Sequence, residues 1–251
     1  MKFKAVLFAA TLALSAQVSA YVEDTEILQP FTDEMAVEMG LTPIEQVQTT
    51  TGKKGISQAT IDRLLSENKV VILVNKAEKG TKPGAQTLRM FVDGIKTMEE
   101  KVSTGTETMV TATSGRRYLR TTPMGYFRPA NVYTMYFSNT WKSDMANAVF
   151  LVGGIAIHAT PNDAAHAGKL GQRASGGCVR VKDTNSVKIR ETVMDSGNGS
   201  GPGEFTTVTE SYRRWKVTDA NRVSVPAINR ANGVRAGGMI KSWNTVVVVH
   251  D

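Results

Sequence analysis

The chain has 251 residues, of which 41% are hydrophobic, and its 30 Lys and Arg residues outnumber 23 Asp and Glu residues, for a net charge of +7. This length suits one domain with additions. The basic residues are scattered in short pairs such as Arg116-Arg117, which is weak evidence for nucleic-acid binding, and no stretch is apolar for long enough to span a bilayer comfortably.

The first twenty residues have the three parts of a secretory signal. Lys2 and Lys4 supply the positive start, residues 5–16 form a short apolar core, and Val18-Ser19-Ala20 is a small-residue cleavage site. We therefore expect the mature chain to begin at Tyr21 and to work outside the cytoplasm, in the periplasm or cell wall. Without the two lysines, 28 basic residues face 23 acidic ones, a net charge of about +5.

A short N-terminal segment, residues 21–66, precedes the main domain, which we place at residues 67–251. Ser57 to Glu67 is predicted to be a helix, with Ser57 as its N-cap and an apolar face. Strands are expected at 70–74, 86–92 and 95–102. Asp93-Gly94 predicts a tight hairpin between the second and third of these strands.

Later elements have weaker patterns. Residues 131–138 alternate as a strand, with Tyr133 on one face and Tyr136 on the other, and we name Tyr136 and Trp141 as candidates for lining a groove. Asp183 is a possible cap for a helix running to Asp195. One or two strands are expected within residues 205–217, the region from there to Gly238 is irregular, and residues 196–239 together have the character of an insertion. Residues 242–249 form a terminal strand.

The chemistry concentrates in residues 149–181. A Val- and Ile-rich strand delivers His158 to a loop, and Gly176-Gly177 precede Cys178, the only cysteine in the chain. The glycines allow positive φ and a close approach of ligand to the backbone. A nearby imidazole is the usual means of making a thiolate nucleophile. Because an unpaired thiol is a liability in an exported protein, and because Arg180 follows it, we favour a reactive cysteine over a buried structural one.

The order of these residues resembles the L,D-transpeptidase catalytic domain, the YkuD-type family of cell-wall enzymes. The signature stands here as His158, a spacer of residues 159–174, and Ser175-Gly176-Gly177-Cys178-Val179-Arg180. Supporting pieces lie at Val102-Ser-Thr-Gly105, at Thr122-Pro-Met-Gly-Tyr-Phe127 and at Leu170-Gly-Gln-Arg-Ala-Ser175. One departure is Gly176, which stands where the family commonly has a histidine.

The resemblance implies a mainly β, sandwich- or barrel-like fold with one or two helices beside the active-site loop. It implies acyl transfer on peptidoglycan stem peptides, without a cofactor or metal and without stable membrane insertion, and carbapenem-type β-lactams as acylating inhibitors. Cys178 would be the nucleophile and His158 the base. The remaining roles are oxyanion binding by the backbone around Gly176 and Gly177, orientation of His158 by the backbone carbonyl of Ala159, and substrate binding by Arg180, Ser175, Tyr136 and Trp141.

Several alternatives stay open at this point. The acceptor can be another stem, which gives a 3→3 cross-link, or water, which makes the enzyme an L,D-carboxypeptidase; a free D-amino acid or a protein lysine is also possible. A non-catalytic wall-binding module would explain Gly176 but not the retained His158 and Cys178. A zinc site at His158, Asp163 and His166 lacks a ligand-spacing rationale, and a papain-like protease would have its cysteine before its histidine.

Overall fold

The computed structural model describes residues 55–111, 117–138, 143–161, 166, 168–197, 205–209, 214–217 and 221–251. Fifteen strands and two helices lie within these ranges, so the fold is mainly β, as expected. The predicted signal, most of the N-terminal segment, Trp141 and Asp163 fall outside the described residues. The division of the chain at residue 67 stays a prediction.

One sheet has five strands, in the order β3-β2-β1-β15-β6. They are β1 (Val70–Asn75), β2 (Thr87–Val92), β3 (Ile95–Lys101), β6 (Gly125–Phe127) and β15 (Thr245–His250). β1 is central, parallel to β15 and antiparallel to β2. Asp93 and Gly94 link β2 to β3 with φ values of 48° and 79°, and this pair of positive φ angles confirms the predicted hairpin.

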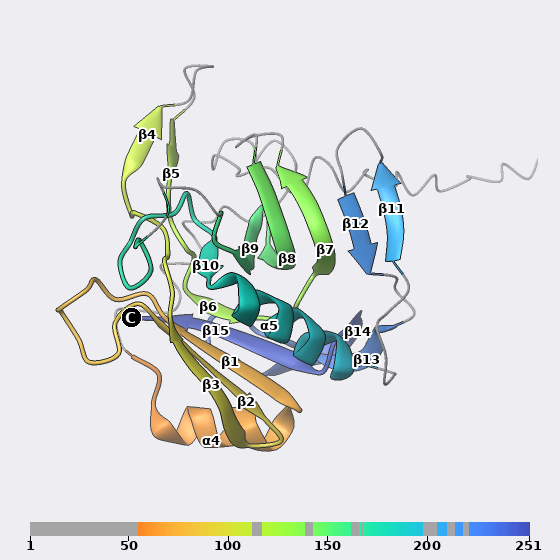
Figure 1. Ribbon diagram of the computed structural model, residues 1–251. Coiled ribbons are helices and arrows are strands. Elements are labelled where there is room, and N and C mark those ends of the chain that lie inside the picture. The colour runs from red at the N-terminus through yellow and green to blue at the C-terminus, as the bar shows by residue number, and fades with distance from the viewer. Residues whose placement is uncertain are drawn as a thin grey trace, which may run out of the picture.

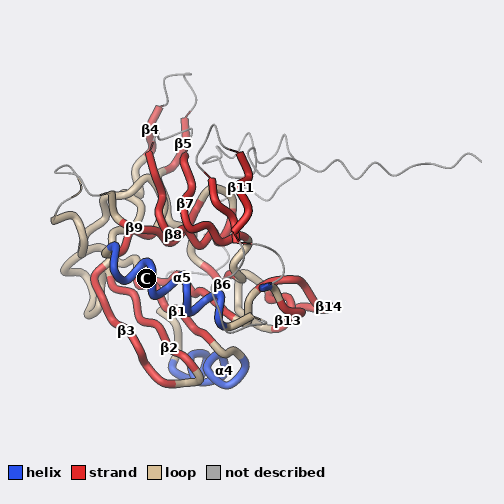
Figure 2. The backbone as a smooth tube through the Cα atoms, turned by 45° about the vertical axis from the view of Figure 1, so that its right-hand side comes forward, coloured by secondary structure: helices blue, strands red, loops and turns tan. Residues whose placement is uncertain are grey.

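The second sheet has six strands, in the order β10-β9-β8-β7-β12-β11. They are β7 (Asn131–Ser138), β8 (Ser143–Val152), β9 (Ile155–Ala159), β10 (Val179–Val181), β11 (Phe205–Thr209) and β12 (Arg214–Val217). Two hairpins project from different ends of the molecule (Figure 2). One joins β4 (Met109–Thr111) to β5 (Arg117–Leu119), and the other joins β13 (Val223–Ile228) to β14 (Arg235–Ser242).

The two sheets enclose the main core together with α5 (Asp183–Asp195), while α4 (Gln58–Glu67) covers the other face of the five-stranded sheet (Figure 1). The side chains of β1 contribute to the packing on both faces of the five-stranded sheet. Val70, Ile72 and Val74 point into the core between the sheets, whereas Val71 and Leu73 pack with α4. Burial on both faces accounts for its uninterrupted apolar sequence. Among the described residues, no helix is long and apolar enough to cross a membrane.

Helix positions agree closely with expectation, with one correction. The Ser57 hydroxyl accepts a hydrogen bond from the Thr60 amide at 3.2 Å, which confirms the N-cap of α4. Asp183 is not the cap of α5, because it is already the first helical residue and Lys182 occupies the cap position. Its carboxylate still lies in the first turn, where negative charge is favourable.

The alternation expected for 131–138 is wrong at its centre. The rings of Tyr133 and Tyr136 lie on the same side, with centroids 5.1 Å apart, and both pack edge-on against Phe150. Asn147, in the paired strand β8, has a φ of 55°. This left-handed residue interrupts the pleat beside the two tyrosines, and an amino-acid pattern of period two cannot register such an interruption.

Candidate active site

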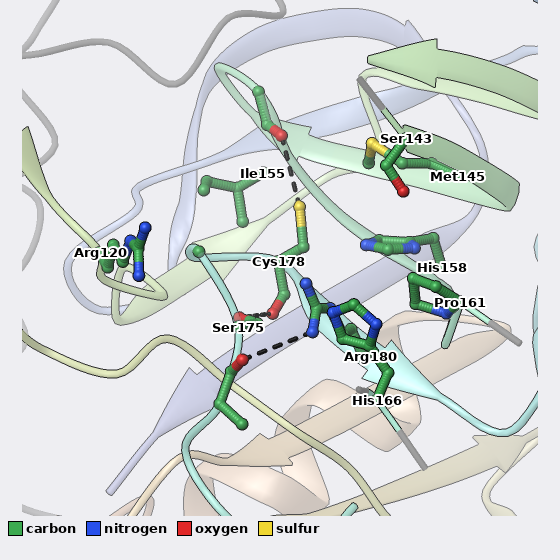
Figure 3. Close-up of a pocket in the computed structure, with 13 residues that line it drawn as sticks. Arg120, Ser143, Met145, Ile155, His158, Pro161, His166, Ser175, Cys178 and Arg180 are labelled. Carbon is green, nitrogen blue, oxygen red and sulfur yellow. Dashed lines mark hydrogen bonds between the residues drawn. The ribbon is translucent and has the colours of Figure 1, made fainter. Parts of the chain in front are cut away.

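A cavity of about 290 Å³ opens beside the chain segment that carries the only cysteine (Figure 3). Its walls come from the ends of β8, β9 and β10, from the loop that precedes β10 and from Arg120, which follows β5. The residues lining it are Arg120, Ser143, Met145, Gly154, Ile155, His158, Pro161, His166, Ala174, Ser175, Gly176, Cys178 and Arg180. His158 and Cys178, which lie twenty residues apart in the sequence, therefore face one space.

His158 is nearly buried, and its imidazole is oriented by the backbone. Nδ1 lies 2.7 Å from the carbonyl oxygen of Ala159, the acceptor that the family resemblance nominates. A contact this short requires the hydrogen on Nδ1, so Nε2 is left as a proton acceptor. Burial and then the charge of Arg180 lower the pKa of His158 to about 3, against the smaller opposing effect of the Ala159 hydrogen bond. The imidazole is neutral at physiological pH.

Cys178 rests as a thiol. Sγ donates to the carbonyl oxygen of Gly154 at 3.5 Å, and burial raises the pKa of the thiol despite the opposing effects of the Ala156 backbone and the Arg180 charge. Its side chain is half-buried and packs against the aromatic cluster that contains Tyr136. The site therefore combines a neutral thiol with a neutral imidazole, and proton transfer must accompany attack on a substrate.

The loop before Cys178 is closed by Ser175. The Ser175 hydroxyl accepts from the amide of Gly177 at 3.1 Å and donates to the carbonyl of Cys178 at 2.5 Å. The backbone of Ser175 makes two further hydrogen bonds. Its amide donates to the carbonyl oxygen of Thr104, and its carbonyl oxygen accepts from the amide of Thr106. These contacts fix the turn that presents the sulfur.

Gly177 cannot be replaced by a larger residue without strain. Its φ is 137°, and a Cβ atom there would lie 2.7 Å from both Ile155 Cδ1 and the carbonyl oxygen of Thr121. The carbonyl oxygen of Gly177 accepts a hydrogen bond of 2.6 Å from the Thr122 hydroxyl. The second glycine of the pair is thus a place where two chain segments approach closely.

Arg180 lies next to the histidine on the neighbouring strand. β10 runs parallel to β9 with Arg180 opposite His158, so the two side chains leave the same face of the sheet. The backbone of Arg180 exchanges two hydrogen bonds with Ser103, and its guanidinium reaches the carbonyl of Ala174 at 3.4 Å. This places a fixed positive charge beside the base.

A buried polar network supports the site from below. Lys76, only 3% exposed, places Nζ 2.8 Å from both Glu107 Oε1 and the carbonyl of Thr122. Glu107 also accepts from the Thr121 hydroxyl at 2.8 Å and from the Thr122 amide at 3.3 Å. The same Thr122 hydroxyl that binds Gly177 accepts from the Gly105 amide at 2.8 Å. The ion pair is thus linked through Thr122 to the cysteine loop.

The structure brings together most residues named from sequence. Those that line the cavity are Cys178, His158, Gly176, Ser175, Arg180 and His166. Tyr136 is not among the lining residues but packs behind the cysteine, and Trp141 is outside the described residues. The amide of Gly177 is already bound by Ser175, so it is not a donor to a ligand.

Sequence reasoning missed seven lining residues, which are Arg120, Ser143, Met145, Gly154, Ile155, Pro161 and Ala174. Arg120 follows β5, far from the His158 to Cys178 stretch, and no local pattern marks it. Ile155 and Pro161 flank His158 closely enough that their proximity to the base was a usable signal. Among the described residues, no three His, Cys, Asp or Glu side chains gather as metal ligands, and Asp163 of the zinc alternative is not described.

A protein-family model matches this chain. The model of the L,D-transpeptidase catalytic domain family, YkuD, matches residues 69–225. A search of curated proteins found no match. An L,D-transpeptidase of Xylanimonas cellulosilytica is similar with 18% identity and a TM-score of 0.41, covering 86% of this chain and 68% of that one.

Two further solved structures are similar at comparable levels. The L,D-transpeptidase of Mycobacterium smegmatis has 15% identity and a TM-score of 0.39, over 73% of this chain and 59% of that one. The catalytic domain of the E. faecium enzyme, in a structure described as acylated by ertapenem, has 18% identity and a TM-score of 0.30, over 48% of this chain and 88% of that one.

Proposed function

Because the chain belongs to the L,D-transpeptidase catalytic domain family, we propose that it is a peptidoglycan L,D-transpeptidase that uses Cys178 as its nucleophile. The observation that carries the proposal is the single cavity shared by Cys178 and by the backbone-oriented imidazole of His158. A nucleophile and a base that are both neutral at rest suit a reaction in which the proton moves only when an acyl donor is bound.

The first half-reaction is acylation by a tetrapeptide stem. Nε2 of His158 takes the thiol proton as Sγ bonds to the carbonyl carbon of the third residue, giving a tetrahedral oxyanion. The C–N bond to the terminal D-alanine then breaks. The imidazolium returns its proton to the departing amine, and free D-alanine and a thioester remain.

The second half-reaction passes the acyl group to an acceptor. The side-chain amine of a second stem attacks the thioester and loses a proton to His158, which then returns it to the departing Cys178 sulfur. The product is a 3→3 cross-link. Water in place of the amine would release a tripeptide, which is the carboxypeptidase alternative.

Stabilisation of the oxyanion falls to the backbone of the cysteine loop. Gly177 is excluded as a donor because its amide binds Ser175, so we assign this role to the amides of Cys178 and Gly176. Preorganised donors of this kind are worth about 10²- to 10³-fold in rate. Gly176 also leaves the cavity without the histidine side chain that the family commonly carries there.

Arg180 is assigned to the terminal carboxylate of the donor. The leaving D-alanine must lie on the His158 side of the sulfur, because His158 protonates its amine. Arg180 is the strand neighbour of His158 and lines the same cavity, so it can form a charge-assisted pair with that carboxylate.

Two expectations from the sequence complete the proposal. Residues 1–20 direct export, so the enzyme meets its substrate in the periplasm or cell wall. Carbapenems acylate Cys178, since their strained amide carbonyl offers the same electrophile as the stem peptide. Solved structures of relatives described as in complex with imipenem or acylated by ertapenem motivate this expectation.

The test is incubation of the mature protein with purified disaccharide-tetrapeptides, read by mass spectrometry, with Cys178→Ser as the matched control. We expect cross-linked dimers with loss of D-alanine for the wild type and unchanged substrate for Cys178→Ser. Tripeptide without dimers would assign the carboxypeptidase activity. Unchanged tetrapeptide and no carbapenem adduct on the wild type would reject the catalytic proposal and favour a wall-binding module.

A further inference from the structure

The cavity is positively charged on two sides of the sulfur. Among the described residues, the ionisable side chains that line it, other than Cys178, are Arg120, His158, His166 and Arg180, and none of these is a carboxylate. In Figure 3, Arg120 lies on one side of Cys178 and His158 on the other. One arginine accompanies the base, and a second, from a different part of the chain, lies across the nucleophile.

The backbone of Arg120 is anchored at the base of the β4–β5 hairpin. Its amide donates to Thr108 O at 3.0 Å, and its carbonyl oxygen accepts from the Glu107 amide at 2.8 Å. The next two residues, Thr121 and Thr122, are buried and bind the Glu107 carboxylate. The guanidinium therefore extends from a fixed point and not from a loose loop.

The same contacts tie Arg120 to the nucleophile. Thr122, two residues further along, donates to the carbonyl of Gly177, which immediately precedes Cys178. The Thr121 carbonyl lies against Gly177 closely enough that no Cβ would fit between them. The position of Arg120 relative to Cys178 is thus set by three buried hydrogen-bonded residues, as a substrate-binding group requires.

We propose that Arg120 binds a second carboxylate of the acyl donor, on the acyl side of the reacting carbonyl, and so selects stems that carry a free carboxylate there. This inference rests on the proposed function. The D-alanine leaves on the His158 side, where Arg180 takes its carboxylate, and the acyl portion must therefore extend toward Arg120. A guanidinium in a partly enclosed cavity favours a carboxylate through paired N–H donors.

Two groups of a stem peptide can supply this carboxylate. One is the free side-chain carboxylate of a diamino dicarboxylic acid at the third position, and the other is the free carboxylate of the acidic second residue. Both present the same chemistry to Arg120. They are distinguished by converting one or the other to its amide, which keeps size and removes charge.

The experiment compares kcat/KM for D-alanine release from three tetrapeptides, one with both carboxylates free and two with one of them amidated. Wild type, Arg120→Gln and Arg120→Lys are measured, with Arg235→Gln as the control for loss of one positive charge on an exposed side chain. We expect the wild type to prefer the free acid over one of the two amides by about tenfold or more, the size of one charge-assisted contact. The amide that is discriminated identifies the source.

Arg120→Gln should bring the ratio of kcat/KM for the free acid to kcat/KM for the discriminated amide close to one, because it lowers kcat/KM for the free acid only. Arg120→Lys should retain part of this ratio, and Arg235→Gln should keep it unchanged. A ratio near one in the wild type, or a ratio unchanged in Arg120→Gln, overturns the inference while Cys178-dependent release of D-alanine still stands. Absence of release from all three peptides, together with no carbapenem adduct, rejects the proposed function and the inference with it.

Discussion

The hydroxyl of Thr122 donates to the carbonyl oxygen of Gly177 at 2.6 Å and accepts from the amide of Gly105 at 2.8 Å. One side chain thereby joins the turn after β3 to the loop that presents the nucleophile. The three residues are far apart in the sequence, and all are buried. The orientation of Cys178 therefore depends on a group that never touches the substrate.

Replacing Thr122 by Val should slow acylation by about tenfold or more. Valine keeps the shape but leaves a buried carbonyl and a buried amide without their partner, at about 1–3 kcal/mol each. The rate of carbapenem adduct formation, measured by mass spectrometry, and the thermal unfolding midpoint should both fall. Thr122→Ser keeps the hydroxyl and should recover most of the acylation rate. Equal rates for the valine and serine variants would show that the hydrogen bonds do not position the loop.

Gly177→Ala should abolish or severely reduce acylation. The new Cβ would lie 2.7 Å from Ile155 Cδ1 and from the Thr121 carbonyl, at a φ of 137° that side chains disfavour. The loop must shift, and Cys178 shifts with it. Gly237→Ala is the matched control, because nothing lies within 4 Å of its Cβ position and its φ is ordinary. Wild-type adduct formation by Gly177→Ala, alongside an unaffected control, would contradict the close approach described above.

Lys76→Met should destabilise the protein by about 3–5 kcal/mol, because it leaves the Glu107 carboxylate without its partner inside the network. Lys96→Met breaks a pair of similar length, Lys96 to Glu99 at 2.6 Å, but both groups are exposed and the change should cost less than about 1 kcal/mol. Denaturant unfolding of both variants gives the comparison. A similar small loss for both would mean that the Lys76–Glu107 pair behaves as a surface pair.

Local patterns predicted the elements that depend on local chemistry. The apolar run of β1, the Asp93-Gly94 turn and the Ser57 cap are all readable from neighbouring residues. The His158 and Cys178 pair was predicted because both ends of a family motif lie within one stretch. Contacts between distant segments had no such signal. Thr122 and Gly177 are 55 residues apart.

Tyr136 marks the same limit in another way. The period-two pattern predicted that Tyr136 and Tyr133 lie on opposite faces of β7. The left-handed φ of Asn147 in β8 accompanies a local break in the pleat, and Tyr136 lies beside Tyr133 on the same face. An asparagine accepts that conformation more readily than most residues, yet asparagine is too common for its presence to predict it. A role for Tyr136 in lining a groove stays a prediction, and in the structure its ring belongs to the buried cluster that packs against Cys178.

The pH dependence of acylation should distinguish a neutral thiol and imidazole at Cys178 and His158 from a preformed thiolate–imidazolium ion pair. The pKa of His158 is lowered to about 3, chiefly by burial, and burial raises the pKa of Cys178 above its ordinary value. At pH values between these two pKa values, His158 is unprotonated and the Cys178 thiol is protonated. The rate of carbapenem acylation should therefore be nearly constant across neutral pH and should fall on the acid side near pH 3. In His158→Ala the rate should instead rise with pH, because only the spontaneously formed thiolate can react. An inflection of the wild-type rate near the ordinary histidine pKa of about 6.5 would contradict the buried, neutral imidazole.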